Sequence, residues 1–253
     1  MTRRAHIVSA CAIAGLLAVG GMGLGQEPPA DAPSSCSKCE LSRANYKRRH
    51  LTGSDFSGAI LTDAVFHRAI LTRANFAGAD LSGANLNKTN STLADFSAAK
   101  MFQVLFYESD GSRANFAEAD LREAKMQGAR LLFANLDGAD LSRAFLTGAR
   151  LDNASLRGAV LEQANMIGAA LSKADLENAR LRGSGLIDAR LRGANLRNAD
   201  LSGADLFNSD LTDADLSGAN LTGARLMRAR TSGAIFEGAI LKGAIMPDGS
   251  VHD

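Results

Sequence analysis

Residues 194–218 read ANLRN ADLSG ADLFN SDLTD ADLSG, five consecutive units of five residues with leucine at the centre of each. The same rhythm runs from Leu41 to Met246, and only three central positions are not apolar or aromatic: Ser91, Gly111 and Thr231. The position two residues before the centre almost always holds alanine, and its only large exceptions are Arg49 and Val104. Each unit therefore directs one large and one small apolar side chain inward and three side chains outward.

A period of five matches neither the 3.6 residues of an α-helix nor the plain alternation of a long strand. It fits a minimal strand that buries two residues, two positions apart, and then turns a corner. Seventeen of the 25 glycines lie two residues after the centre, where a corner would need a positive φ. A flexible glycine-rich linker would not keep leucine and alanine in phase over so many units, so the pattern predicts a β-solenoid.

The unit Ala-Asp-Leu-Ser-Gly at 214–218 resembles the repeat of the pentapeptide-repeat family, and the likeness extends over residues 41–246. The resemblance implies an all-β fold, a right-handed quadrilateral β-helix with four units in each coil. It would form roughly ten coils stacked about 4.8 Å apart, a rod roughly 50 Å long.

Residues 1–25 differ from the repeats and are typical of an export signal. Arg3 and Arg4 precede the apolar stretch Ile7–Leu24, and small residues follow near a possible cleavage site. An uncleaved anchor is the alternative, because about 17 apolar residues can span a bilayer. The protein is therefore expected in the periplasm or at the cell envelope, either free or tethered by this segment.

The solenoid is predicted to begin after a Pro-rich linker at residues 26–35 and to occupy residues 36–253. The motif Cys36-Ser-Lys-Cys39 would cap its amino-terminal end, and the turn Met246-Pro-Asp-Gly-Ser250 would stop the rhythm at the other. Residues 89–112 depart most from the repeat, so we expect a bulge, a loop or a changed cross-section there.

The pair Cys36 and Cys39 has several interpretations. A zinc site would need two more ligands, and His50 and His67 fall on outward positions. Haem attachment is excluded because Glu40 follows Cys39, and no thioredoxin-like pattern surrounds a redox pair. The favoured interpretation is a structural disulfide or two buried thiols at the cap, and export favours the disulfide; a zinc site and a redox pair are the alternatives. We expect no metal and no cofactor.

Catalysis is not expected. A solenoid filled by its own leucine and alanine leaves no closed pocket, and none of the four histidines has an evident triad partner. The net charge of +1 provides no bulk field toward nucleic acid or anionic lipid, although it excludes no local patch. We therefore expect no nucleic-acid partner and no membrane contact beyond the amino-terminal segment.

Two outer features stand out. Four acidic residues encircle one coil, and Arg180 and Arg190 should lie one coil below two of them, which predicts ion pairs between coils: Asp200, Asp205, Asp210 and Asp215. Large apolar residues also recur every 20 residues just after the centre and should line up outside: Ile167, Ile187, Phe207 and Met227. We expect this row to bind a partner or a second copy. The alternative is that its members cover one another or lie under the tail at 247–253.

Two functions follow from these observations. The first is an exported, non-enzymatic scaffold that acts through protein contacts or self-association. The second comes from the resemblance, because some members of the family mimic duplex DNA and regulate type II topoisomerases. The export signal, the net charge and four arginines on one predicted side oppose it: Arg130, Arg150, Arg190 and Arg230.

Overall fold

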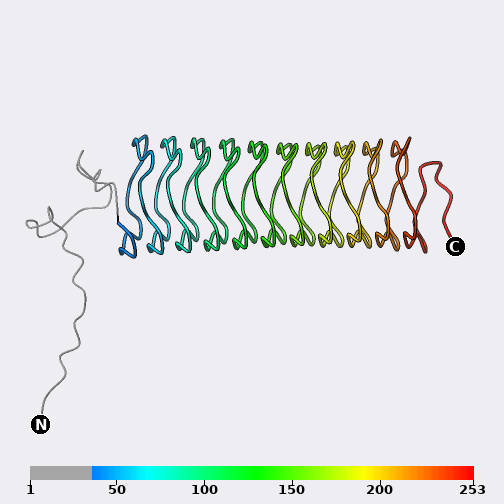
Figure 1. The fold of residues 1–253 in the computed structure, drawn as a ribbon, viewed down its shortest axis with the longest axis horizontal. Coiled ribbons are helices and arrows are strands. Elements are labelled where there is room, and N and C mark those ends of the chain that lie inside the picture. Colours follow the sequence, from blue (N-terminus) through cyan, green and yellow to red (C-terminus); the bar gives the residue numbers. More distant parts are fainter. Residues whose placement is uncertain (1–35) are drawn as a thin grey trace, which may run out of the picture.

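The computed structural model describes residues 36–253, which form one rod of stacked coils (Figure 1). No α-helix and no continuous strand occurs in these residues; each unit instead contributes a single bridging residue. The parallel bridges run from Glu40↔Ile60 to Arg225↔Ile245, and each joins residues 20 positions apart. Four units therefore make one coil, which confirms the quadrilateral β-helix and its register.

The backbone of one unit shows how each corner is made. The N–H groups of Leu196 and Asn198 donate to the carbonyls of Asp215 and Ser217 in the next coil, at 2.7 and 2.9 Å. The N–H of Ala199 donates back to the carbonyl of Leu196 at 3.1 Å and closes the turn. We name the five places of a unit from this example: centre (Leu196), first turn position, second turn position (Asn198), alanine position (Ala199) and bridge position.

Every second turn position has a positive φ, as a type II turn requires. Glycine holds 17 of them, which agrees with the prediction from sequence. Another 25 hold a side chain, however, and none of these is β-branched. A positive φ is especially unfavourable for β-branched residues. The corner therefore selects against valine, isoleucine and threonine more strictly than it selects for glycine.

The preference for Asp or Asn at the bridge position has a local cause. The Oδ1 atom of Asp200 accepts the N–H of Ser202 at 3.0 Å, and the same bond recurs in many units, for example from Thr212 to Asp210 at 3.1 Å. In this Asx turn the side chain accepts the backbone N–H of the residue two positions later, so a donor at the corner is satisfied.

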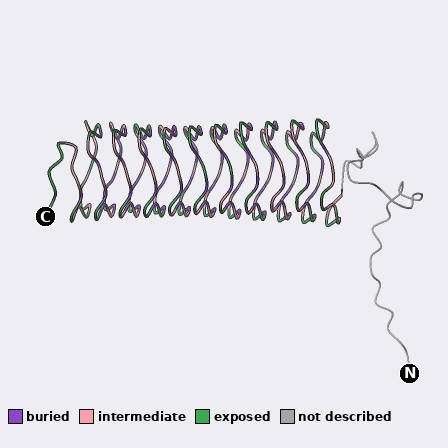
Figure 2. Cartoon of the chain, turned by 180° about the vertical axis from the view of Figure 1, so that it is seen from behind, coloured by how far each residue is buried: buried purple, intermediate pink, exposed green. Residues whose placement is uncertain are grey.

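The core is a continuous column of buried side chains from the central and alanine positions, and the buried positions recur in every coil of Figure 2. Aromatic residues fill its amino-terminal half. Rings 20 residues apart stack with centroids 4.9 to 5.2 Å apart, in the order Phe56, Phe76, Phe96 and Phe116. Offset stacking adds to the stability of such pairs beyond the burial of their surface.

The expectation of an irregular segment at residues 89–112 is wrong, because bridges and turns continue through it without a break. The polar residues at inward positions satisfy one another: the Thr89 hydroxyl donates to the Leu86 carbonyl at 2.8 Å and lies 3.0 Å from the Ser91 hydroxyl. At Gly111 the Phe106 ring takes the missing volume, since a Cβ there would lie 3.2 Å from its Cζ. Neighbouring side chains compensate, so the backbone does not change.

The carboxyl-terminal end is only partly covered. The chain turns after Met246, and Val251 pairs antiparallel with Ile245 while the His252 N–H donates to the Ala244 carbonyl at 2.9 Å. This tail shields one side of the last coil. On the other sides, Ile235 and Ile240 remain 47% and 53% exposed.

Candidate interaction surfaces

The apolar row, defined as Ile167, Ile187, Phe207 and Met227, is a continuous line of side chains on one corner of the rod. All four occupy the first turn position of successive coils, and the carbonyl of each accepts an N–H from the coil below, at 2.8 to 3.0 Å for the last three. Pro247 continues the line, because its carbonyl accepts the Arg228 N–H at 2.9 Å. The stacking predicted from the 20-residue period is therefore present.

The four side chains are not equally exposed. Ile167 is exposed, whereas Ile187, Phe207 and Met227 are half-buried. Two guanidinium groups cover Phe207, with the Cζ atoms of Arg225 and Arg228 at 5.0 and 5.7 Å from the ring centroid. The sequence period predicted the row but not this cover, which depends on the direction of long side chains.

A polar row lies beside the apolar row, at the second turn position of the same coils. It consists of Asp188, Asn208 and Arg228, all exposed. The Asn208 amide donates to Asp188 Oδ1 at 2.5 Å. The row thus carries a negative charge at one end, a positive charge at the other and a neutral amide between them.

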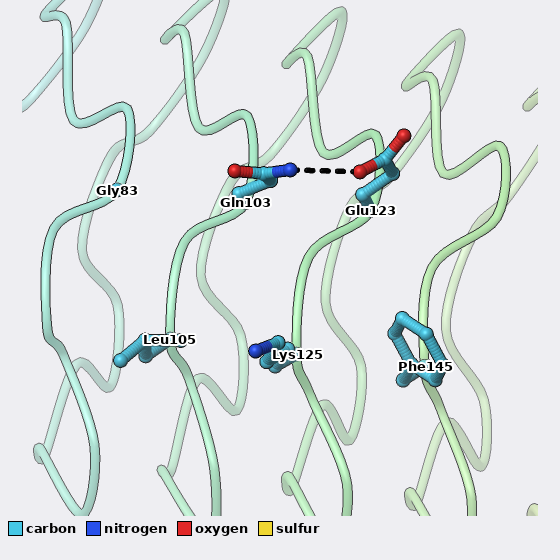
Figure 3. Close-up of a pocket in the computed structure, with 6 residues that line it drawn as sticks. All are labelled: Gly83, Gln103, Leu105, Glu123, Lys125 and Phe145. Carbon is cyan, nitrogen blue, oxygen red and sulfur yellow. Dashed lines mark hydrogen bonds between the residues drawn. The ribbon is translucent and has the colours of Figure 1, made fainter.

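A shallow groove crosses the side of the rod that bears Leu105, Lys125 and Phe145 (Figure 3). Gln103 Nε2 donates to Glu123 Oε2 at 2.8 Å along its edge, and Gly83 leaves a gap below. The groove is open to solvent and combines the Phe145 ring with the polar side chains Gln103, Glu123 and Lys125. It can contribute to a contact surface, and its residues do not pair a nucleophile with a base.

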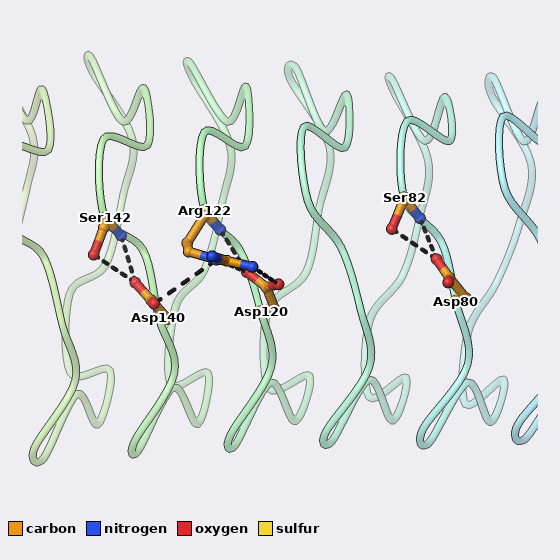
Figure 4. A network of polar contacts seen from close by, with 6 residues as sticks. All are labelled: Asp80, Ser82, Asp120, Arg122, Asp140 and Ser142. Carbon is orange, nitrogen blue, oxygen red and sulfur yellow. Dashed lines mark hydrogen bonds and ion pairs between the residues drawn. The ribbon is translucent and has the colours of Figure 1, made fainter.

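Ion pairs between charged side chains recur along the outside of the rod. In Figure 4, Arg122 binds both carboxylate oxygens of Asp120 at 2.6 and 2.7 Å and approaches Asp140 at 3.9 Å. The Arg122 guanidinium lowers the pKa of the Asp120 carboxyl. Asp80, two coils away, accepts a bond from the Ser82 hydroxyl (2.7 Å), and no arginine among the described residues forms an ion pair with it. Exposed pairs of this kind each contribute about 0 to 1 kcal/mol.

The four acidic residues around one coil have partners that differ from those predicted. Arg180 and Arg190 do lie one coil below Asp200 and Asp210, as bridge partners. Arg180 nevertheless pairs with Glu162. Asp205 pairs with Arg225 at 2.6 Å and Asp210 with Arg230 at 3.4 Å, both from the coil above, whereas Asp215 pairs with Arg197 of the coil below at 3.4 Å. Inter-coil ion pairs form, but not in the predicted combinations.

Cys36 and Cys39 lie together at the amino-terminal end of the rod, with their Cα atoms 5.4 Å apart and their Sγ atoms paired. Cys36 also contacts the core. We predict that the protein carries this disulfide when it is exported to an oxidising compartment. Peptide mapping after alkylation should then find Cys36 and Cys39 blocked until a reductant is added, whereas Cys36→Ser should free Cys39 for alkylation. Two alkylated thiols in the unreduced exported protein would refute the bond.

Other candidates for chemistry are scattered. His50 and His252 are exposed and His67 is half-buried, while His6 lies outside the described residues. Within residues 36–253, no three His, Cys, Asp or Glu side chains are arranged to hold a metal ion. None of the described residues forms a helix that is long and apolar enough to cross a bilayer. The predicted signal at 1–25 and the linker at 26–35 also lie outside the described residues.

Comparison with known families shows where the chain belongs. The model of the family described as "Pentapeptide repeats" matches in eight copies, which cover residues 39–110 and 114–246. The chain is a pentapeptide-repeat protein. A comparison of this pentapeptide-repeat protein with curated proteins found no match.

Among solved structures, this pentapeptide-repeat protein is similar to HetL from the cyanobacterium Nostoc sp. strain PCC 7120, a protein involved in heterocyst differentiation regulation. The two are 32% identical, the match covers 85% of this chain and 92% of HetL, and the TM-score is 0.56. A trypsin-treated form of QnrB1, a plasmid-mediated fluoroquinolone resistance protein, is 21% identical over 80% of this chain and 91% of that one, with a TM-score of 0.51. The second likeness concerns the fold alone.

Proposed function

We propose that the protein is an exported, non-enzymatic scaffold that acts through protein contacts on the outside of the rod, and that its simplest partner is a second copy. The apolar row carries this proposal. An isolated exposed isoleucine has little meaning, but large apolar residues aligned over four successive coils form a continuous strip of the kind that marks a contact site.

The polar row gives the reason to favour a second copy. In a two-fold pair of antiparallel rods, each residue faces the residue that lies equally far on the other side of the axis. With the axis at Phe207, Ile187 would face Met227 of the second copy, and Asp188 would face its Arg228. Both the apolar and the charged groups would then be complementary without any further partner.

The size of the surface is consistent with this role. At about 4.8 Å for each coil the apolar row is roughly 15 Å long. A stable interface buries about 800 Å² on each partner, so the row would form the centre and the surrounding polar groups the rim. The charges of the rim would set the antiparallel direction, since complementary charges determine register more than affinity.

Export and location rest on the sequence of residues 1–25. We infer that the rod works in the periplasm or at the envelope, where the Cys36–Cys39 pair would oxidise. The likeness to HetL supports a role in regulation or binding, because its description names a regulatory process.

A DNA-mimicking regulator of a type II topoisomerase has less support. A mimic of duplex DNA needs unpaired negative charges along the rod. Here Asp205 and Asp210 are neutralised by arginines, and one side carries arginine in several coils: Arg130, Arg150, Arg190 and Arg230.

The double substitution Ile187→Asp with Phe207→Asp is expected to abolish self-association and leave the fold intact, because both side chains belong to the outer row. Sedimentation velocity measures the association, and far-ultraviolet circular dichroism measures the fold. The matched control is Ser202→Asp with Thr222→Asp, which places two carboxylates at the same turn position of adjacent coils on another corner. An unchanged sedimentation profile for the folded double variant would rule out the row as the site.

Charge exchange tests the antiparallel arrangement itself. Asp188→Arg would place two arginines opposite each other and weaken association about tenfold, and Arg228→Asp would act likewise with two carboxylates. Combining both changes in one chain should restore association, because the pairs are then reversed but complementary. Failure of the combined variant to recover, with both single variants impaired, would contradict this geometry.

A further inference from the structure

The amino-terminal end of the rod is positively charged, although the net charge of the whole chain is close to zero. Residues 36–75, about two coils, hold seven Lys or Arg and three Asp or Glu, whereas residues 76–253 hold 19 and 22. The net charge of +1 therefore combines a basic end with a slightly acidic remainder. In the first coil, Lys38, Arg43 and Arg48 occupy the second turn position of three of the four corners, and all are exposed.

One corner of this basic end stacks like charges directly. The Arg48 N–H donates to the His67 carbonyl at 2.9 Å and the Arg68 N–H to the Asn87 carbonyl at 3.0 Å, which places Arg48, Arg68 and then Lys88 in one line. Successive coils are about 4.8 Å apart, and like charges at that spacing destabilise each other.

Of the three cations in this line, only the last one, Lys88, forms an ion pair within residues 36–253. Lys88 pairs with Glu108 at 3.1 Å. In the part of the chain that the structure describes, no carboxylate lies within ion-pair distance of Lys47, Arg48 or Arg68. Burial lowers the pKa of the half-buried His67, and the nearby cations Arg68, Lys47, Lys88 and Arg48 lower it further. The corner thus carries a positive field that no ion pair with Lys47, Arg48 or Arg68 offsets within residues 36–253.

We propose that this basic end, defined as Lys38, Arg43, Lys47, Arg48 and Arg68, binds the surface of a bilayer that contains anionic phospholipids. Each Lys or Arg close to an anionic membrane contributes about 1 kcal/mol of attraction. The charges surround the end of a rod rather than line a groove, which suits a flat surface better than a nucleic-acid strand.

The position of the apolar stretch Ile7–Leu24 supports a membrane as the partner. Only residues 25–35 separate it from Cys36, and a chain of that length spans at most about 40 Å when fully extended. If that stretch is kept as an anchor, the basic end is the part of the rod that lies next to the bilayer. The rod would stand on the membrane and present the apolar row, in its carboxyl-terminal half, away from it. This inference does not depend on self-association.

Co-sedimentation of the full chain with vesicles tests the proposal. We expect the wild type to bind vesicles of phosphatidylcholine and phosphatidylglycerol about tenfold more strongly than vesicles of phosphatidylcholine alone. The apolar stretch Ile7–Leu24 contributes to the binding of both kinds of vesicle. The ratio of the two affinities therefore measures the electrostatic contribution alone. Reversal of three charges, Lys47→Glu, Arg48→Glu and Arg68→Glu, should remove most of the preference, and added salt should reduce it in the wild type.

The matched control reverses three exposed arginines of a distant coil, Arg182→Glu, Arg190→Glu and Arg192→Glu, and should keep the preference. Thermal melts followed by circular dichroism establish that both variants fold. An equal loss in the two variants would show a response to net charge only and overturn the proposal. A wild type that binds short duplex DNA but does not distinguish the vesicles would assign the basic end to nucleic acid and also overturn it.

Discussion

Replacing Phe96 by alanine is expected to lower the free energy of unfolding by about 3 to 5 kcal/mol. The ring is fully buried and stacks between Phe76 and Phe116, with centroid distances of 5.1 and 4.9 Å, and it also meets Phe106 edge-on at 6.5 Å. Its removal would open a cavity that the hydrogen-bonded coils above and below cannot close. Denaturation by guanidinium, followed by circular dichroism, measures the loss.

Phe133→Ala provides the matched control, because the same atoms are removed from a ring that is 56% exposed, with the Arg113 guanidinium over it at 5.8 Å. It should change stability by less than about 0.5 kcal/mol. Equal losses at the two positions would mean that the aromatic column is not part of the core.

Leu196→Ala is expected to cost about 2 to 5 kcal/mol through cavity formation, and Ala194→Leu about 1 to 3 kcal/mol through overpacking. Both side chains are buried, at inward positions two residues apart. Ser202→Ala, at a first turn position, should change stability little, since the bond that holds this corner comes from the Ser202 backbone N–H. Guanidinium denaturation of the three variants ranks them, and an order with Ser202→Ala as the most destabilising would refute the inward and outward assignment.

The register of the whole rod could be predicted because it depends on a pattern repeated in every unit. At Leu196 and Ala199 the sequence period alone indicates burial, and a one-residue shift would expose every leucine. The same period places Ile187 and Phe207 at the first turn position, on the outside of the rod. Burial and exposure of this kind depend on the backbone repeat and not on which side chains are neighbours.

Properties that depend on particular neighbours could not be predicted. The bulge expected near Ser91 and Gly111 is absent because Thr89 and Phe106 compensate for them, and those compensations link residues that the period treats as independent. Arg180 likewise reaches Glu162 rather than Asp200, because a long side chain can choose among several carboxylates. The basic end was not predicted, because the net charge of the whole chain adds its positive charge to the slightly negative charge of the other coils.

Fractionation of cells that express the full chain with a carboxyl-terminal tag tests the proposed role most directly. An exported scaffold should appear in the periplasmic fraction, or in the membrane fraction if the amino-terminal segment or the basic end holds it there. Recovery of the folded chain in the cytoplasm would contradict the exported scaffold and would favour regulation of a cytoplasmic target such as a topoisomerase.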